Sequence, residues 1–231
     1  YTKGMALNTA IGQGDVNVTP MQLAVLYSAV GNKGHVFQPQ IVQRIESPEG
    51  QVVESFAPKQ VREIPMTDEQ YKLIIDALVS VVNEPGGTAF RTRSADYTIA
   101  GKTGTAQVAK LGTVRLKKEQ MDYFERDHAW FASFAPAEDP ELTVIVLNEH
   151  GGHGGSDAAP TAAAVFAKYF ELKKADSFAL GEEWVPPKPP KPVFYSKPNP
   201  AAPPDVSDPG LAGDVPPPPE ATVQAPTGAP R

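Results

Sequence analysis

Proline is concentrated at one end of this chain. Sixteen of the 25 prolines lie between Pro186 and Pro230, and four of them are consecutive at 216–219. Proline has no backbone N–H and fits neither the middle of a helix nor the middle of a sheet. A segment of this composition also buries too little apolar surface to offset its ordering entropy. The sequence therefore predicts a folded domain over residues 1–174 and a disordered, proline-rich tail over residues 175–231.

Two helices in the first half of the domain are predicted by the same start signal. In each, a threonine is followed three residues later by a glutamine, which is the pattern of a capping box. The pairs are Thr19 with Gln22 and Thr67 with Gln70. Apolar residues then recur at helical spacing until a glycine-containing turn ends each helix. Before the first helix, the run Gly12-Gln13-Gly14 predicts a loop.

Three strands are predicted in the second half, at 99–108, 128–135 and 142–149. The last two are almost wholly apolar, as strands covered on both faces are. The turn-rich segment 136–140 between them indicates an antiparallel hairpin. Helices, then three strands, then a closing helix predict an α+β fold, in which helices pack on an antiparallel sheet.

Other segments complete this outline. Short strands are predicted around the turn at 47–50, and a long loop over residues 109–127. A short helix is expected at Thr88-Ala89-Phe90, and the closing helix is predicted to be capped by Ser156 with Asp157.

The predicted strand at 99–108 contains the run Gly101-Lys102-Thr103-Gly104-Thr105. Glycine is rare inside strands, and it marks a bulge or a place where a ligand or another backbone comes close. A lysine and two hydroxyls on an exposed strand offer positive charge and hydrogen bonds to a carboxylate and to a developing oxyanion. The run therefore predicts a strand edge that is open to an anionic substrate.

Phosphate binding is the first alternative for this run, because phosphate-binding loops end in Gly-Lys-Ser/Thr. Such a loop has another glycine five positions earlier, where this chain has Asp96. Such a loop is also followed by a helix, whereas the residues Thr-Gly-Thr after Lys102 are poor helix formers.

The net charge of −6 and the lack of a basic stripe argue against nucleic acid as a partner.

Four motifs, taken in order, resemble the C-terminal half of a class B penicillin-binding protein transpeptidase domain. The glycine-rich loop at 150–155 is most similar to the elongation-type group, penicillin-binding protein 2. The likeness covers residues 1–174. The four motifs are the Gly12-Gln13-Gly14 loop running into 19–24, Gly87-Thr88-Ala89, the run from Gly101 to Gln107, and the run from Trp130 to Pro136.

The resemblance implies a serine-type D,D-transpeptidase without a cofactor or a metal. Its substrates would be peptidoglycan stem peptides ending in D-Ala-D-Ala, and β-lactams would acylate it. Lys102 would place positive charge near the substrate carboxylate and the proton-transfer network, and the hydroxyls of Thr103 and Thr105 would bind that carboxylate. The backbone N–H of Thr105 would be an oxyanion-hole donor, and Gly104 would keep the edge bare for a substrate strand.

The family's nucleophile motif is missing. Neither Ser-x-x-Lys nor Ser-x-Asn occurs in the 231 residues, and the resemblance places both before Tyr1. We therefore expect a fragment that is inactive alone and that pairs with the N-terminal half of the same domain. The resemblance also implies a parent protein at the periplasmic face of the inner membrane, beside a membrane glycosyltransferase, although this chain has no apolar run long enough to span a membrane.

Several alternatives remain open. His150 and His153, with Asp157 and with His128 elsewhere, offer a possible metal site. Ser156 and Asp157 with a histidine offer a weaker hydrolase site, because the last glycine of the nucleophile elbow is absent. A non-catalytic module with a carboxylate-accepting strand, a β-lactamase and a D,D-carboxypeptidase also fit the strand motif. The absence of cysteine excludes disulfides and thiolate metal sites but leaves the compartment open.

Overall fold

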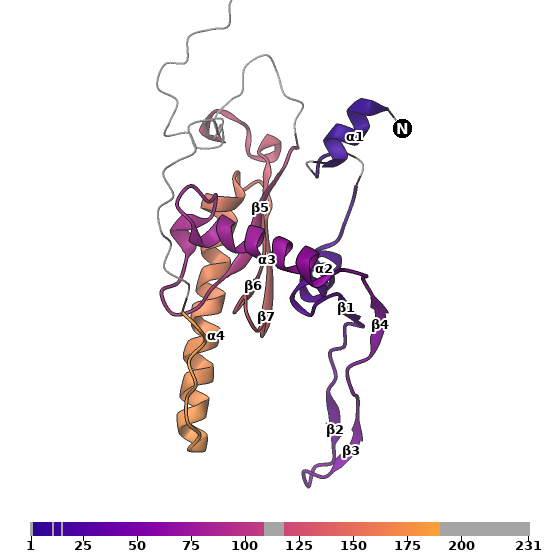
Figure 1. The fold of residues 1–231 in the computed structure, drawn as a ribbon, viewed down its shortest axis with the longest axis vertical. Coiled ribbons are helices and arrows are strands. Elements are labelled where there is room, and N and C mark those ends of the chain that lie inside the picture. Colours follow the sequence, from indigo (N-terminus) through magenta and orange to yellow (C-terminus); the bar gives the residue numbers. More distant parts are fainter. Residues whose placement is uncertain (1, 11, 15, 109–117, 190–231) are drawn as a thin grey trace, which may run out of the picture. The chain divides into compact units, whose positions relative to one another are not determined.

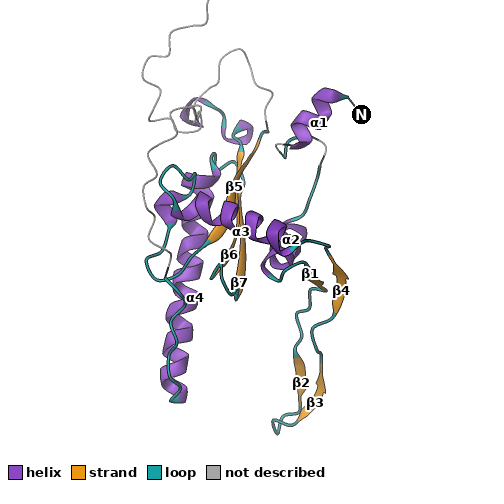
Figure 2. Cartoon of the chain, viewed as in Figure 1, coloured by secondary structure: helices purple, strands orange, loops and turns teal. Residues whose placement is uncertain are grey.

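The computed structural model describes residues 2–10, 12–14, 16–108 and 118–189. Figure 1 labels the helices and strands in this part of the chain, and Figure 2 colours them by type. The helices are α1 (Lys3–Ala10), α2 (Pro20–Gly31), α3 (Asp68–Asn83) and α4 (Ala159–Leu180). The strands are β1 (His35–Phe37), β2 (Arg44–Glu46), β3 (Val52–Ser55), β4 (Gln60–Glu63), β5 (Ala100–Ala106), β6 (His128–Ala135) and β7 (Leu142–Asn148).

Strands β5, β6 and β7 form one antiparallel sheet, in that order. The register pairs Lys102 with Ala132 on β6, and Ala132 in turn pairs with Ile145 on β7. Within the described residues, β5 is therefore an outer strand with one unpaired edge. The strands predicted at 128–135 and 142–149 are confirmed to within one residue, and so is the α+β fold class.

The two faces of this sheet pack against different helices. Successive side chains of a strand point to opposite faces, so Phe131 and Phe134 of β6 lie on opposite sides. Phe131 belongs to a buried cluster that includes Phe166 and Phe170 of α4. Phe134 belongs to a second cluster, against which α2 and α3 pack Tyr27, Val30, Ile75, Leu78 and Val79. This two-sided burial explains why β6 is apolar along its whole length.

Helices α2 and α3 begin at the predicted capping boxes. In α2, the N–H of Gln22 donates to Thr19 Oγ1 (3.2 Å), and the N–H of Thr19 donates to Gln22 Oε1 (2.8 Å). In α3, the matching distances between Thr67 and Gln70 are 3.2 and 3.0 Å. These bonds satisfy N–H groups that have no partner within the first helical turn, so both predictions are confirmed.

Helix α4 begins differently from its prediction. Ser156 and Asp157 do not cap it: they lie inside a single π-helical turn, η4 (Gly154–Ala158), and Ala158 directly precedes the helix without a side-chain cap. The reason is that the Asp157 carboxylate is engaged by the backbone N–H of His153, one turn earlier, and by groups described below.

The C-terminal end of α4 passes the predicted domain boundary at Lys174. Residues 175–180 are free of proline and glycine, so the helix propagates until Gly181, which adopts the left-handed conformation of a C-terminal cap. Residues 190–231 of the predicted tail lie outside the described residues.

The first 63 residues contribute α1, α2 and two short antiparallel ribbons. β2 pairs with β3 around the predicted turn at 47–50, and β1 pairs with β4. The side chains of β2, β3 and β4 are exposed. Helix α1 is not predicted by the sequence pattern, because all of its residues are exposed and no apolar stripe marks it.

The connection that enters β6 is only partly described. Of the predicted loop 109–127, residues 118–127 form two short 3₁₀ turns, η2 (Lys118–Gln120) and η3 (Tyr123–Glu125), and the rest lies outside the described residues. The short helix expected at Thr88-Ala89-Phe90 corresponds to the 3₁₀ turn η1 (Phe90–Thr92). Among the described helices, none has the length and apolar character needed to cross a membrane.

Candidate active site

The predicted site residues lie together on β5, and their backbone groups define its open edge. Lys102 Nζ donates to the carbonyl of Thr103 (2.8 Å), and Gln13 Nε2 donates to the carbonyl of Thr105 (2.7 Å). In an antiparallel pair, the N–H and C=O of one residue point to the same side, and alternate residues share that side. Thr103 and Thr105 therefore direct their N–H groups to the unpaired edge, as an oxyanion donor at Thr105 requires.

The side chains of this run divide between the two faces of the strand. Thr103 pairs with Phe131 and so lies on the α4 face, together with Thr105 two residues on. Lys102 and Gly104 lie on the opposite face, where Gly104 pairs with Trp130. Lys102 is exposed, and its ammonium reaches back to the edge through its bond to Thr103.

Thr88 is a neighbour of the site that the sequence analysis does not single out. Its hydroxyl lies 2.7 Å from the hydroxyl of Thr103. The chain can place it there because Gly87 packs against the end of α3, where a Cβ would lie 2.7 Å from the carbonyl of Ser80 and closer still to that of Val81. The run at 87–89 and the Gly-Gln-Gly run at 12–14 both belong to the motifs of the family resemblance, but no local pattern shows that Thr88 meets Thr103 or that Gln13 meets the carbonyl of Thr105.

A buried amide fixes the start of β5. Asn83, at the end of α3, is 5% exposed. Its Nδ2 donates to the carbonyl of Val79 (2.7 Å) and to that of Ile99 (2.8 Å). The second bond links α3 to the residue just before β5. Hydrogen bonds that satisfy buried backbone groups of this kind are expensive to lose.

Two glycines pack directly on the β5–β6 backbone. A Cβ on Gly154 would lie 2.7 Å from the carbonyl oxygen and 2.9 Å from the nitrogen of Gly104, and closer still to the carbonyl of Trp130. A Cβ on Gly155 would collide with the carbonyl of Thr88. The turn η4 can approach the strands this closely only because both positions lack a side chain.

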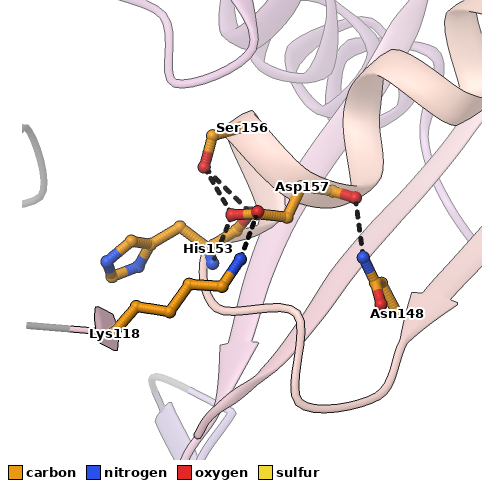
Figure 3. A network of polar contacts seen from close by, with 5 residues as sticks. All are labelled: Lys118, Asn148, His153, Ser156 and Asp157. Carbon is orange, nitrogen blue, oxygen red and sulfur yellow. Dashed lines mark hydrogen bonds and ion pairs between the residues drawn. The ribbon is translucent and has the colours of Figure 1, made fainter. Parts of the chain in front are cut away.

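Asp157 is the centre of a polar network that holds this turn (Figure 3). Its carboxylate accepts hydrogen bonds from Lys118 Nζ (2.7 Å), from the hydroxyl of Ser156 (2.6 Å) and from the N–H of His153 (3.0 Å). Asn148 Nδ2 donates to the Asp157 carbonyl (3.2 Å). Burial alone would raise the pKa of Asp157, but the bonds from Lys118, Ser156 and His153 and the charge of Lys118 hold it below its usual value.

The histidines that suggested a metal site make other contacts. The N–H of His150 donates to His128 Nδ1 (2.9 Å), and His150 Nδ1 lies 3.2 Å from the carbonyl of Arg126. No group of three potential ligands gathers among the described residues. The hydrolase alternative is also weakened, because the Ser156 hydroxyl donates a hydrogen bond to the Asp157 carboxylate (2.6 Å) and not to a histidine ring.

Chemically, the open edge of β5 offers what an anionic peptide end needs. An extended peptide adds to an unpaired strand edge through backbone hydrogen bonds. The Lys102 ammonium and the threonine hydroxyls can bind a carboxylate, and an outward N–H can stabilise an oxyanion.

A separate hollow of about 520 Å³ lies beside the far strand, β7, and is lined by Val146, Leu147, Asn148, Glu149 and Thr161.

Residues 2–168 match the family described as the penicillin binding protein transpeptidase domain. The chain belongs to this family. The match runs from the start of α1 into the middle of α4, so all the strands that the structure describes lie within it. The family resemblance carried by the four sequence motifs is thereby confirmed.

Curated relatives of this chain include two proteins named peptidoglycan D,D-transpeptidase MrdA. The one from Acinetobacter baumannii is 34% identical over 175 residues, which cover 75% of this chain and 25% of that protein. The one from Haemophilus influenzae is 34% identical over 182 residues, with 75% and 27% covered. The chain thus spans about a quarter of the length of these relatives.

Two solved structures similar to this chain carry related names. Pseudomonas aeruginosa PBP2 in complex with WCK 5153 aligns with a TM-score of 0.57 and 33% identity, over 74% of this chain and 33% of that one. PBP2 of Helicobacter pylori, solved in a complex with MreC, aligns with a TM-score of 0.57 and 30% identity, over 74% and 28%.

Proposed function

We propose that the open edge of β5 is the substrate-binding strand of a serine-type peptidoglycan D,D-transpeptidase. The observation that supports this most is the meeting of three features at the edge of β5 that is unpaired within the described residues: the Lys102 ammonium bound to the Thr103 carbonyl, the hydroxyls of Thr103 and Thr105 on the α4 face, and the outward N–H of Thr105. The nucleophile would come from a segment with Ser-x-x-Lys that these 231 residues do not contain. We call that segment together with this chain the complete enzyme.

The reaction would be acyl transfer in two steps. The serine hydroxyl attacks the carbonyl carbon of the penultimate D-Ala, and the terminal D-Ala leaves as the free amino acid with the proton that the serine lost. The amine of a neighbouring stem peptide then attacks the resulting ester, which forms the crosslink and returns a proton to the serine. A β-lactam would follow the first step only and remain attached.

Each proposed site residue has a role in that scheme. Lys102 supplies positive charge near the substrate carboxylate and the proton-transfer network, and Thr103 and Thr105 bind that carboxylate. The N–H of Thr105 stabilises the oxyanion, a contribution of about 10²–10³ in rate for a typical donor. Gly104 keeps the edge free for the substrate strand.

The proposal extends to where the complete enzyme works. By its family it would act at the periplasmic face of the inner membrane, beside a membrane glycosyltransferase. Because H. pylori PBP2 was solved in a complex with MreC, MreC is a further candidate partner of the complete enzyme.

Labelling with a fluorescent penicillin tests this function. The complete enzyme should become labelled and keep the label, this chain alone should not, and Thr103→Ala should slow labelling about 10- to 100-fold, the worth of a hydrogen bond to a charged group. Thr161→Ala, an exposed threonine on α4, is the matched control and should leave the rate unchanged. Rapid release of the label would indicate a β-lactamase or a carboxypeptidase instead, and no labelling would favour the non-catalytic binding module.

A further inference from the structure

The turn η4 and the two proposed carboxylate-binding threonines share one face of the sheet. Thr103 and Thr105 lie on the α4 face of β5, on either side of Gly104. Gly154 packs on the backbone of Gly104, the residue between them, and Gly155 packs near Thr103, where a Cβ would lie 3.7 Å from the methyl group of Thr103. A displacement of the turn would therefore alter the support of the strand segment that carries both threonines.

Asp157 holds the turn in position, because three groups of the polar network donate hydrogen bonds to its carboxylate. Its side chain is 23% exposed, and that of its partner Lys118 is 34% exposed. Lys118 reaches it from the start of η2, and its alkyl chain packs over Gly152, where a Cβ would lie 3.0 Å from Lys118 Cδ. Figure 3 shows Lys118, Ser156 and His153 converging on the one carboxylate.

Lys118 and Ser156 give this network two separable parts. The contacts from Ser156 and His153 are local to the turn, so an amide could still accept them. The ion pair with Lys118 joins segments that are 39 residues apart, and it needs the charge of the carboxylate. A partly buried pair of this kind is screened less by solvent than an exposed pair.

We propose that Asp157 is a positioning residue for carboxylate recognition on β5. Through Lys118, Ser156 and the N–H of His153, it holds the glycine turn against the strand and keeps Thr103 and Thr105 in place to bind the carboxylate of the substrate. This inference rests on the proposed function, because it assigns to Asp157 a task in the same acyl transfer.

The test compares two penicillins on the complete enzyme: benzylpenicillin, which carries the carboxylate, and its methyl ester, which does not. The ratio of their acylation rates isolates carboxylate recognition, because general damage to the fold slows both reactions alike. The variants are Asp157→Asn, Asp157→Ala and Lys118→Met. Glu141→Gln is the control, because it removes an ion pair with Lys173 that the turn does not contact.

For Asp157→Ala, we expect the acid-to-ester ratio to fall about tenfold. A change of that size corresponds to the loss of roughly one hydrogen bond to the substrate carboxylate. Asp157→Asn and Lys118→Met should each lower the ratio by a smaller factor, and Glu141→Gln should not change it. The measurement is the acylation rate of each penicillin, followed by mass spectrometry of the intact acyl-enzyme.

Two outcomes would overturn the inference: an acid-to-ester ratio that stays unchanged in both Asp157 variants, including the case in which both rates fall equally, or an effect confined to Lys118→Met. If Asp157→Ala fails to fold, Asp157→Asn decides, because it keeps the hydrogen bonds within the turn. A wild-type enzyme that reacts with neither penicillin would refute the proposed function itself, a result distinct from an unchanged ratio.

Discussion

Replacing Gly154 by alanine should destabilise the domain, because the added methyl has no space. Its Cβ would lie 2.7 Å from the carbonyl oxygen and 2.9 Å from the nitrogen of Gly104, and closer still to the carbonyl of Trp130. All three neighbours are backbone atoms of two paired strands, so no side chain can rotate away. Overpacking of this kind costs typically about 1–3 kcal/mol, and we expect the upper end of that range for Gly154→Ala.

The assay is urea unfolding of the complete enzyme, followed by circular dichroism. Gly4→Ala is the matched control: its nearest atom, Thr2 Oγ1, lies 3.9 Å away, and the residue is in the exposed helix α1. Alanine there should be neutral or stabilise by up to about 1 kcal/mol, because glycine is the poorer helix former. If the free energy of unfolding of Gly154→Ala lay within about 0.5 kcal/mol of wild type, the range of ordinary surface changes, the turn would not be closely packed against the two strands.

Three further predictions concern stability. Thr67→Ala removes the cap of α3 and should lower the free energy of unfolding by about 1 kcal/mol, measured in the same urea experiment. Asn83→Ala leaves the carbonyl of Ile99, just before β5, without its hydrogen bond and should lower the free energy of unfolding by about 1–3 kcal/mol. Amide hydrogen exchange should show reduced protection at the start of β5. Because Lys118, Ser156 and the N–H of His153 hold the pKa of Asp157 below its usual 3.8, its charge stabilises the fold at neutral pH, and that contribution disappears as the pH falls through the lowered pKa. The stability difference between wild type and Asp157→Asn should therefore be present at pH 7 and vanish in acid, whereas a constant difference would contradict the role of the charge.

The elements predicted best are those with local signals. The capping boxes at Thr19 and Thr67 each depend on residues three positions apart, and both were found where the sequence indicated them. The strands of the apolar hairpin were also found, because burial on both faces leaves an unbroken apolar run. The failure at the start of α4 has the opposite cause, since Asp157 could have capped a helix locally but is engaged by Lys118, 39 residues away.

The candidate site shows the same division. The Lys-Thr-Gly run and its flanking glycines marked β5 as an open strand, and alternation fixed which residues share a face. The sequence did not indicate that Thr88 would meet Thr103, or that Gln13 would meet the carbonyl of Thr105, because these contacts join segments 15 and 92 residues apart.

The sequence by itself determined the starts of α2 and α3, the strands of the apolar hairpin, the α+β class and the chemistry gathered on β5, because each of these depends on neighbours within a few residues. Only the tertiary structure decided which backbone groups of β5 face its open edge, which distant side chains meet them, and how Gly154 and Asp157 support the strand. Those features arise from the packing of distant segments into one core, where the space available at each atom depends on every element around it.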